Sequence, residues 1–92
     1  MHHVLNISYT QPLDIVDTFR PDHAAWIAEE IEAGRLILAG RNEHATGGVL
    51  ISGDISVEEA EALIAADPYT KAGVAEYART GFTVSFKGAG IP

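Results

Sequence analysis

The sequence predicts a single α+β domain with the element order βαββαβ. Two observations lead to this prediction. Short segments alternate between apolar and polar residues or are continuously apolar, which is typical of strands, and two longer segments carry apolar residues at helical spacing. The chain has 92 residues, a length that suits one domain with one core, and residues 1–92 contain no low-complexity stretch or linker that would divide them.

The first strand is expected over residues 3–9, where side chains alternate with period two. Residues 10–20 contain a proline and several acidic residues and are expected to form a loop. Pro21 then opens a helix, because proline is tolerated at the first helical position, and Gly34 is its expected C-cap. The stripe of this helix that is expected to face the core consists of Ala24, Ile27, Ala28 and Ile31.

Two short apolar strands follow over residues 35–39 and 49–52, joined by a polar hairpin loop. Ser56-Val57-Glu58-Glu59 is a capping box, so a second helix begins there. It should end near Ala66, since the residue before a proline disfavours the α conformation. Residues 67–73 are expected to form an irregular or 3₁₀ turn, and the last strand lies within residues 76–87. The expected buried face of the second helix is Val57, Ala60, Leu63 and Ile64.

This order is that of the ferredoxin-like fold, a four-stranded antiparallel sheet with both helices on one face. Leu36-Ile37-Leu38 and Val49-Leu50-Ile51 are apolar on both sides of their strands. Such strands are usually covered on both faces, and one layer of helices covers only one. The second cover is most simply another subunit, so the sequence predicts a homodimer whose sheets pack face to face.

Composition excludes several classes of function. The chain has 13 acidic and 6 basic residues, and a formal charge of -7 leaves little to neutralise phosphates, so nucleic acid is not an expected partner. It has no cysteine, which excludes disulfides and thiolate chemistry and suits a cytoplasmic location. No apolar run approaches the length of a membrane-spanning helix, and no signal peptide is apparent, so no membrane association is expected.

The topology brings together the start of the first helix, the hairpin and the end of the second helix. His23 and Asp67 are therefore expected near one another. A helix N-terminus disfavours an imidazolium, and a carboxylate at a helix C-terminus needs a partner, so the two could form a base and its orienting acid. Alternatively, Asp67 only caps its own turn and His23 is an exposed residue of the first helical turn.

Arg41, His44 and Tyr69 are expected to line the same pocket. Arg41 could bind an anionic substrate or pair with Glu43, His44 could be a solvated loop residue, and Tyr69 could donate a proton or pack beside the neighbouring proline. No set of three or four ligands has a recognised metal-binding spacing, so no metal is expected. Gly47-Gly48 reads as a turn before a strand, not a phosphate-binding loop, and no cofactor is expected.

Four segments together resemble the YciI-like (YCII-related) family. They are Arg20-Pro21-Asp22-His23, Glu32-Ala33-Gly34-Arg35-Leu36 with Ala39-Gly40 after it, Gly47-Gly48-Val49-Leu50-Ile51, and Asp67-Pro68-Tyr69-Thr70-Lys71-Ala72-Gly73-Val74. The resemblance spans about residues 3–87. It implies a dimeric α/β-barrel of ferredoxin-like subunits and an active site with a histidine and an aspartate, which by matching motif are His23 and Asp67.

One branch of that family looks like dehydrochlorinases of chlorinated hydroxyquinols, and muconolactone isomerases share the fold. Many short relatives carry a Pro-Arg pair before the two glycines, where this chain has Glu43-His44-Ala45-Thr46. The leading hypothesis is thus a small-molecule enzyme, a lyase or isomerase, acting on a lactone or a hydroxylated ring. The alternatives are a non-catalytic metabolite-binding or accessory dimer, and a purely structural dimerisation module without a pocket.

Overall fold

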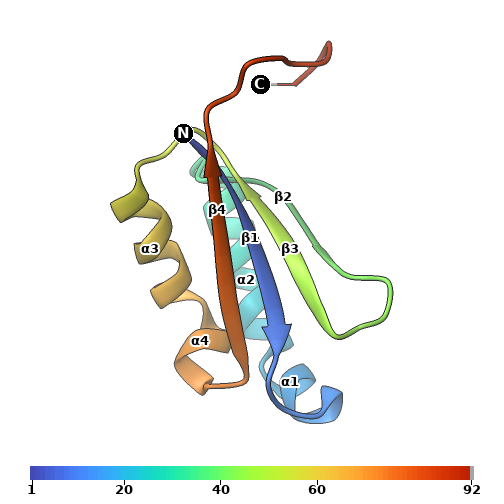
Figure 1. Cartoon of the computed structure of the whole chain (residues 1–92). Helices are drawn as coiled ribbons and strands as arrows, with labels where there is room; N and C mark the ends of the chain where they lie inside the picture. The colour runs from blue at the N-terminus through green and yellow to red at the C-terminus, as the bar shows by residue number, and fades with distance from the viewer. Residues whose placement is uncertain (92) are drawn as a thin grey trace.

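The computed structural model describes residues 1–91 and contains the expected elements together with two further short helices. The strands pair antiparallel in the order β2-β3-β1-β4, and α2 and α3 cover one face of the sheet (Figure 1). This is the predicted ferredoxin-like arrangement. The elements are β1 (His2–Tyr9), α1 (Leu13–Thr18), α2 (Arg20–Glu32), β2 (Leu36–Arg41), β3 (Gly47–Ser52), α3 (Val57–Ala66), α4 (Pro68–Ala72) and β4 (Ala75–Phe82).

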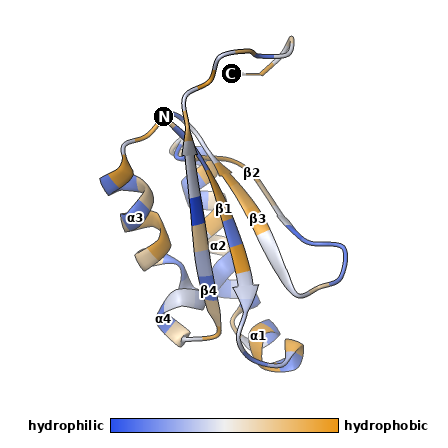
Figure 2. Ribbon diagram, in the orientation of Figure 1, coloured by the Kyte–Doolittle hydropathy of each residue, from blue (hydrophilic) through white to orange (hydrophobic). Residues whose placement is uncertain are grey.

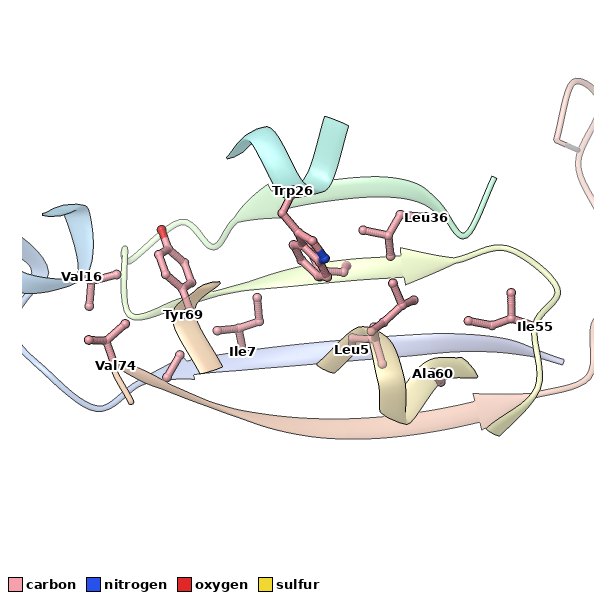
Figure 3. Packing of buried hydrophobic residues seen from close by; sticks show 12 residues of the cluster. Leu5, Ile7, Val16, Trp26, Leu36, Ile55, Ala60, Tyr69 and Val74 are labelled. Carbon is pink, nitrogen blue, oxygen red and sulfur yellow. The ribbon is translucent and has the colours of Figure 1, made fainter. Parts of the chain in front are cut away.

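The core lies between the sheet and the helices (Figure 3). Leu5 of β1 pairs with Leu50 of β3, and both are fully buried together with Leu36 of β2. The helices contribute Trp26 and Leu63 to the same cluster. Because side chains alternate along a strand, this register also decides which polar residues of the sheet face the helices.

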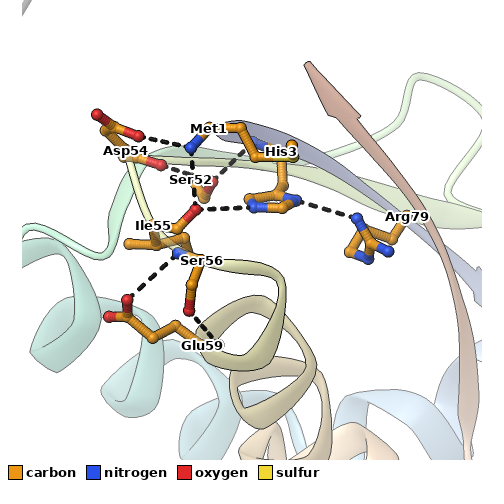
Figure 4. Close-up of polar contacts among 9 residues, drawn as sticks. Met1, His3, Ser52, Asp54, Ile55, Ser56, Glu59 and Arg79 are labelled. Carbon is orange, nitrogen blue, oxygen red and sulfur yellow. Dashed lines mark hydrogen bonds and ion pairs between the residues drawn. The ribbon is translucent and has the colours of Figure 1, made fainter. Parts of the chain in front are cut away.

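Local sequence signals explain how α2 and α3 are bounded. The Ser56 hydroxyl accepts a hydrogen bond from the Glu59 amide at 3.0 Å, and the Ser56 amide donates to the Glu59 carboxylate at 3.2 Å (Figure 4). This is the predicted capping box, and α3 ends at Ala66 as expected. Gly34 follows the end of α2 with a φ of +80°, a conformation that glycine adopts without steric cost.

Tertiary packing corrects four details. The expected loop contains α1, and the expected irregular turn contains α4. The buried side chains of α2 are His23, Trp26 and Glu30, whereas Ile31 is exposed, because the large indole ring is the one that fills the space above the sheet. On α3 the predicted Val57 is exposed as well. Ala24 and Ala28 of the predicted stripe are also exposed.

The last strand ends earlier than its alternating pattern indicates. Phe82 pairs with His2, the first residue of β1, so no residue of β1 remains to pair with residues 83–87. Phe86 is consequently 95% exposed, in a tail that extends away from the sheet (Figure 1).

The sheet face opposite the helices is open in the single chain. Leu38, Val49 and Phe82 are 63%, 37% and 40% exposed on it. Figure 2 shows the C-terminal half of β3 coloured as hydrophobic. Within residues 1–91, no helix combines the length and apolar character needed to cross a membrane.

Candidate functional site

His23 and Asp67 form a buried hydrogen-bonded pair. His23 lies in the first turn of α2, and Asp67 is the residue between α3 and α4. The imidazole Nδ1 is 2.6 Å from Oδ1 of Asp67, whose side chain is completely buried. The structure therefore brings together the two residues whose proximity the topology predicted.

Asp67 also caps α4, so the two alternative roles considered for it occur together. Its Oδ1 accepts the Tyr69 amide at 3.0 Å, which is the turn-capping contact of an Asx residue before proline. Its Oδ2 accepts a hydrogen bond from the Tyr77 hydroxyl of β4. A buried carboxylate with three such partners is well compensated for its loss of hydration.

The partners of Asp67 are hydrogen-bond donors, which suits a carboxylate as the shared acceptor. Burial, followed by the charge and hydrogen bond of Asp67, raises the pKa of the Tyr77 phenol well above its usual value, so this hydroxyl keeps its proton. The Tyr69 amide can only donate. Since an ionised carboxylate is an acceptor only, His23 completes the set by donating its Nδ1 proton to Asp67. Its Nε2 makes no hydrogen bond within residues 1–91.

Aromatic packing holds the imidazole in one plane. The Tyr69 ring stacks on His23 with a centroid distance of 3.8 Å and an interplanar angle of 7°. Trp26, one turn further along α2, contacts the imidazole at a centroid distance of 5.8 Å. Tyr69 is buried, and this burial raises the pKa of its phenol. Tyr69 thus packs directly against the imidazole of His23.

A cavity of about 220 Å³ opens beside this pair, between α2 and the helix-facing side of the sheet. This volume is below the roughly 300–1,000 Å³ of pockets for drug-sized ligands, so it suits a small metabolite. Its polar wall is formed by Tyr9, Arg20, His23, Arg41 and Tyr69, and apolar residues of β1 to β3 and α2 form the rest.

Arg41 lines the cavity but is already paired. Its guanidinium donates to Asp17 of α1 at 2.5 Å and to the Tyr9 hydroxyl at 2.9 Å. The hydrogen bond to Asp17 raises the pKa of Arg41 further above its ordinary value. Arg41 thus forms its ion pair with Asp17, and not with Glu43, the partner considered from the sequence.

His44 is not among the residues that line the cavity. Its side chain is 79% exposed at the tip of the hairpin, 3.5 Å from Glu43. Asn42 and Thr46 close the hairpin by two hydrogen bonds, and the tip between them extends away from α2 (Figure 1). The single chain therefore does not bring His44 to His23.

His3 lies at the opposite end of the sheet. It is fully buried, its Nε2 donates to the Ile55 carbonyl at 3.2 Å, and its Nδ1 accepts from Arg79 at 3.3 Å (Figure 4). These contacts anchor the chain before α3. Nowhere in the described chain do three histidine or acidic side chains gather in a way that could hold a metal ion.

Comparisons with known proteins agree with this architecture. The family model of the YCII-related domain matches residues 1–83. The chain belongs to the YCII-related domain family. No curated protein matches its sequence.

Among solved structures, this YCII-related domain is similar to 5-chloro-2-hydroxyhydroquinone dehydrochlorinase from Burkholderia phenoliruptrix AC1100, in its complex with 2,5-dihydroxybenzoquinone. The two share 22% sequence identity and a TM-score of 0.76, over 90% of this chain and 94% of the other. At this identity the similarity demonstrates a common fold.

Proposed function

We propose that this YCII-related domain is an enzyme that transfers protons on a small organic substrate, as a lyase or isomerase does. His23 acts as the general base or acid, and Asp67 orients it. The observation that carries the proposal is the buried contact of 2.6 Å between Nδ1 and the carboxylate, which leaves Nε2 of a ring that lines the cavity as the reactive nitrogen.

Each neighbour of the pair has a chemical role in this mechanism. Asp67 selects the tautomer with the proton on Nδ1 and stabilises the imidazolium that forms when Nε2 takes a proton. Tyr77 and the Tyr69 amide hold the carboxylate in place, and the stacked Tyr69 ring limits rotation of the imidazole. A base held in one orientation loses little entropy on reaching the transition state.

The size of the cavity favours a substrate of about one ring, such as a hydroxylated quinone, a halogenated hydroxyquinol or a lactone. The structurally similar dehydrochlorinase, solved with a dihydroxybenzoquinone, supports testing this class first. A shared fold alone does not transfer a reaction, so the His23 geometry remains the main support.

The test measures proton transfer directly. Candidate substrates, including 2,5-dihydroxybenzoquinone, 5-chloro-2-hydroxyhydroquinone and simple lactones, are incubated with the protein in D₂O, and loss of C–H signal, release of chloride and isomerisation are followed. His23→Gln and Asp67→Asn should lower any rate by at least about a hundredfold, as removal of a general base does. His2→Gln, at the far end of β1, is the matched control and should keep the wild-type rate.

Two results would contradict this mechanism. The first is a rate in His23→Gln that equals that of the wild type. The second is tight binding of these compounds without any exchange or conversion, which would favour the non-catalytic metabolite-binding module.

We further infer that the domain forms a homodimer through the open sheet face. The support is the exposure of Leu38, Val49 and Phe82 on one face of the sheet, which would leave an apolar surface in contact with water in a monomer. A cytoplasmic location remains a prediction from the absence of cysteine.

A further inference from the structure

Two arginines line the cavity, and their charges are balanced differently. Arg41 is held by Asp17 at 2.5 Å and by the Tyr9 hydroxyl, and its guanidinium lies 5.4 Å from the centroid of the Tyr9 ring. Its positive charge is therefore compensated within the protein. Arg20, the first residue of α2, makes no hydrogen bond or ion pair within residues 1–91.

The charge of Arg20 acts on the same groups that surround His23. Burial is the main cause that raises the pKa of the Tyr69 phenol, and the positive charges of Arg41 and Arg20 oppose this rise. Arg20 thus contributes an uncompensated positive charge to a cavity whose other arginine is neutralised. In a chain with a formal charge of -7, this positive charge lies at a cavity next to His23, where it would favour an anionic ligand.

The guanidinium group suits an anion with two oxygens. It is planar, stays charged at every accessible pH and presents donors in a fork that matches a carboxylate or an ionised vicinal oxygen pair. A bound anion would provide the counter-charge that Asp17 provides for Arg41.

We propose that the ligand of this cavity is a small organic anion, and that Arg20 binds its carboxylate or ionised hydroxyl group. Arg20 is then a specificity-determining residue that places one end of the molecule, while His23 faces the other. This inference deepens the proposed function and rests on it for the role of His23. Anion binding itself can be measured without any turnover.

The experiment compares two probes of nearly equal shape, benzoate and benzamide, which differ in charge. Binding is followed from the amide signals of Gly40 and Gly48, which line the cavity, in two-dimensional NMR titrations. The variants are Arg20→Gln and, as a matched control, Lys71→Gln. Lys71 is an exposed cation of α4 that does not line the cavity, so this control has the same change in charge near the site. 2,5-Dihydroxybenzoquinone, which ionises in neutral water, serves as a third probe.

Wild type and Lys71→Gln should bind benzoate about tenfold more tightly than benzamide, a difference typical of one charge-assisted contact. Arg20→Gln should reduce this ratio to about one. Its affinity for 2,5-dihydroxybenzoquinone should fall by a similar factor, while its benzamide affinity stays unchanged.

Three results would overturn the inference: an unchanged benzoate-to-benzamide ratio in Arg20→Gln, an equal loss in Lys71→Gln, or no binding of either anion to the wild type. These results are distinct from a failure of the proposed function. If Arg20→Gln loses the anion preference but no compound exchanges protons, the anion site stands and catalysis fails. If His23→Gln abolishes a reaction while Arg20→Gln retains the anion preference, only the role of Arg20 fails.

Discussion

Tyr77→Phe removes a single oxygen atom and tests how the site holds its carboxylate. The Tyr77 hydroxyl donates to Oδ2 of the fully buried Asp67, and phenylalanine fills nearly the same volume. A hydrogen bond to a charged group contributes about 1.5–3 kcal/mol to stability. With a slope in urea of about 1–2 kcal/mol per molar for a domain of this size, the unfolding midpoint should fall by about 0.8–3 M.

The pH dependence makes this prediction specific. Burial and Asp67 raise the pKa of Tyr77 in the folded chain above its ordinary 10.0. Below pH 10 the phenol is protonated in both states, so the stability difference between wild type and variant is constant. Above pH 10 the unfolded chain releases this proton and the folded chain retains it. Wild-type stability should therefore decrease by about 1.4 kcal/mol for each further pH unit, a loss that phenylalanine cannot undergo.

The assay is urea unfolding followed by circular dichroism at pH 7, 9, 10.5 and 11. Tyr69, whose pKa is also raised, is present in both proteins, so its contribution cancels from the difference. The gap between the two unfolding free energies should be constant up to pH 9 and should shrink by about 1.4 kcal/mol by pH 11. Equal stability at pH 7 would refute the hydrogen bond, and a gap that stays constant through pH 11 would refute the protonation argument.

Two further predictions concern the sheet. Leu38→Asp should convert a dimeric wild type into a monomer in light-scattering chromatography. Val57 is also an exposed apolar residue but lies on α3, so Val57→Asp should leave the mass unchanged. A wild type that is already monomeric would disprove the proposed interface. Gly47→Ala should destabilise the fold by more than about 3 kcal/mol in thermal unfolding, because the added Cβ would lie 1.8 Å from the Ile7 carbonyl oxygen. In Gly40→Ala the added Cβ meets no atom within 4 Å, so stability should change by less than about 1 kcal/mol. Similar melting temperatures for both variants would contradict this packing.

Elements with local signals could be predicted from the sequence, and elements decided by partners could not. The capping box at Ser56 and the glycine after α2 depend on a few neighbouring residues, so their positions were predicted correctly. The end of β4 depends on where β1 begins, which is a property of the pairing register. The buried face of α2 depends on whether Trp26 or the alanine and isoleucine stripe contacts the sheet, and both faces are apolar enough to be plausible in isolation.

The candidate site shows the same division. The proximity of His23 and Asp67 could be predicted from topology alone, because the direction of each helix and strand decides which ends of the elements lie together. Tyr77 was not predicted to contact Asp67, because this contact depends on the pairing register that places Tyr77 opposite Ile7. The alternation of side chains along β4 could have indicated that Tyr77 faces the helices. The pairing of Arg41 with Asp17 also escaped, because Asp17 belongs to a segment expected to be a loop.

The number of groups committed to Asp67 argues against a role limited to capping α4. A capping carboxylate needs only the Tyr69 amide and can remain in contact with water, as most helix caps do. Here the same carboxylate is fully buried and also binds a tyrosine hydroxyl and an imidazole. Burial of a charge with one partner would be unfavourable, so the two additional donors are what make this position tolerable. A structural pair would be complete at that point. The second nitrogen of His23, in contrast, has no partner among residues 1–91 and belongs to a ring that lines the cavity, and acid–base chemistry requires such an arrangement.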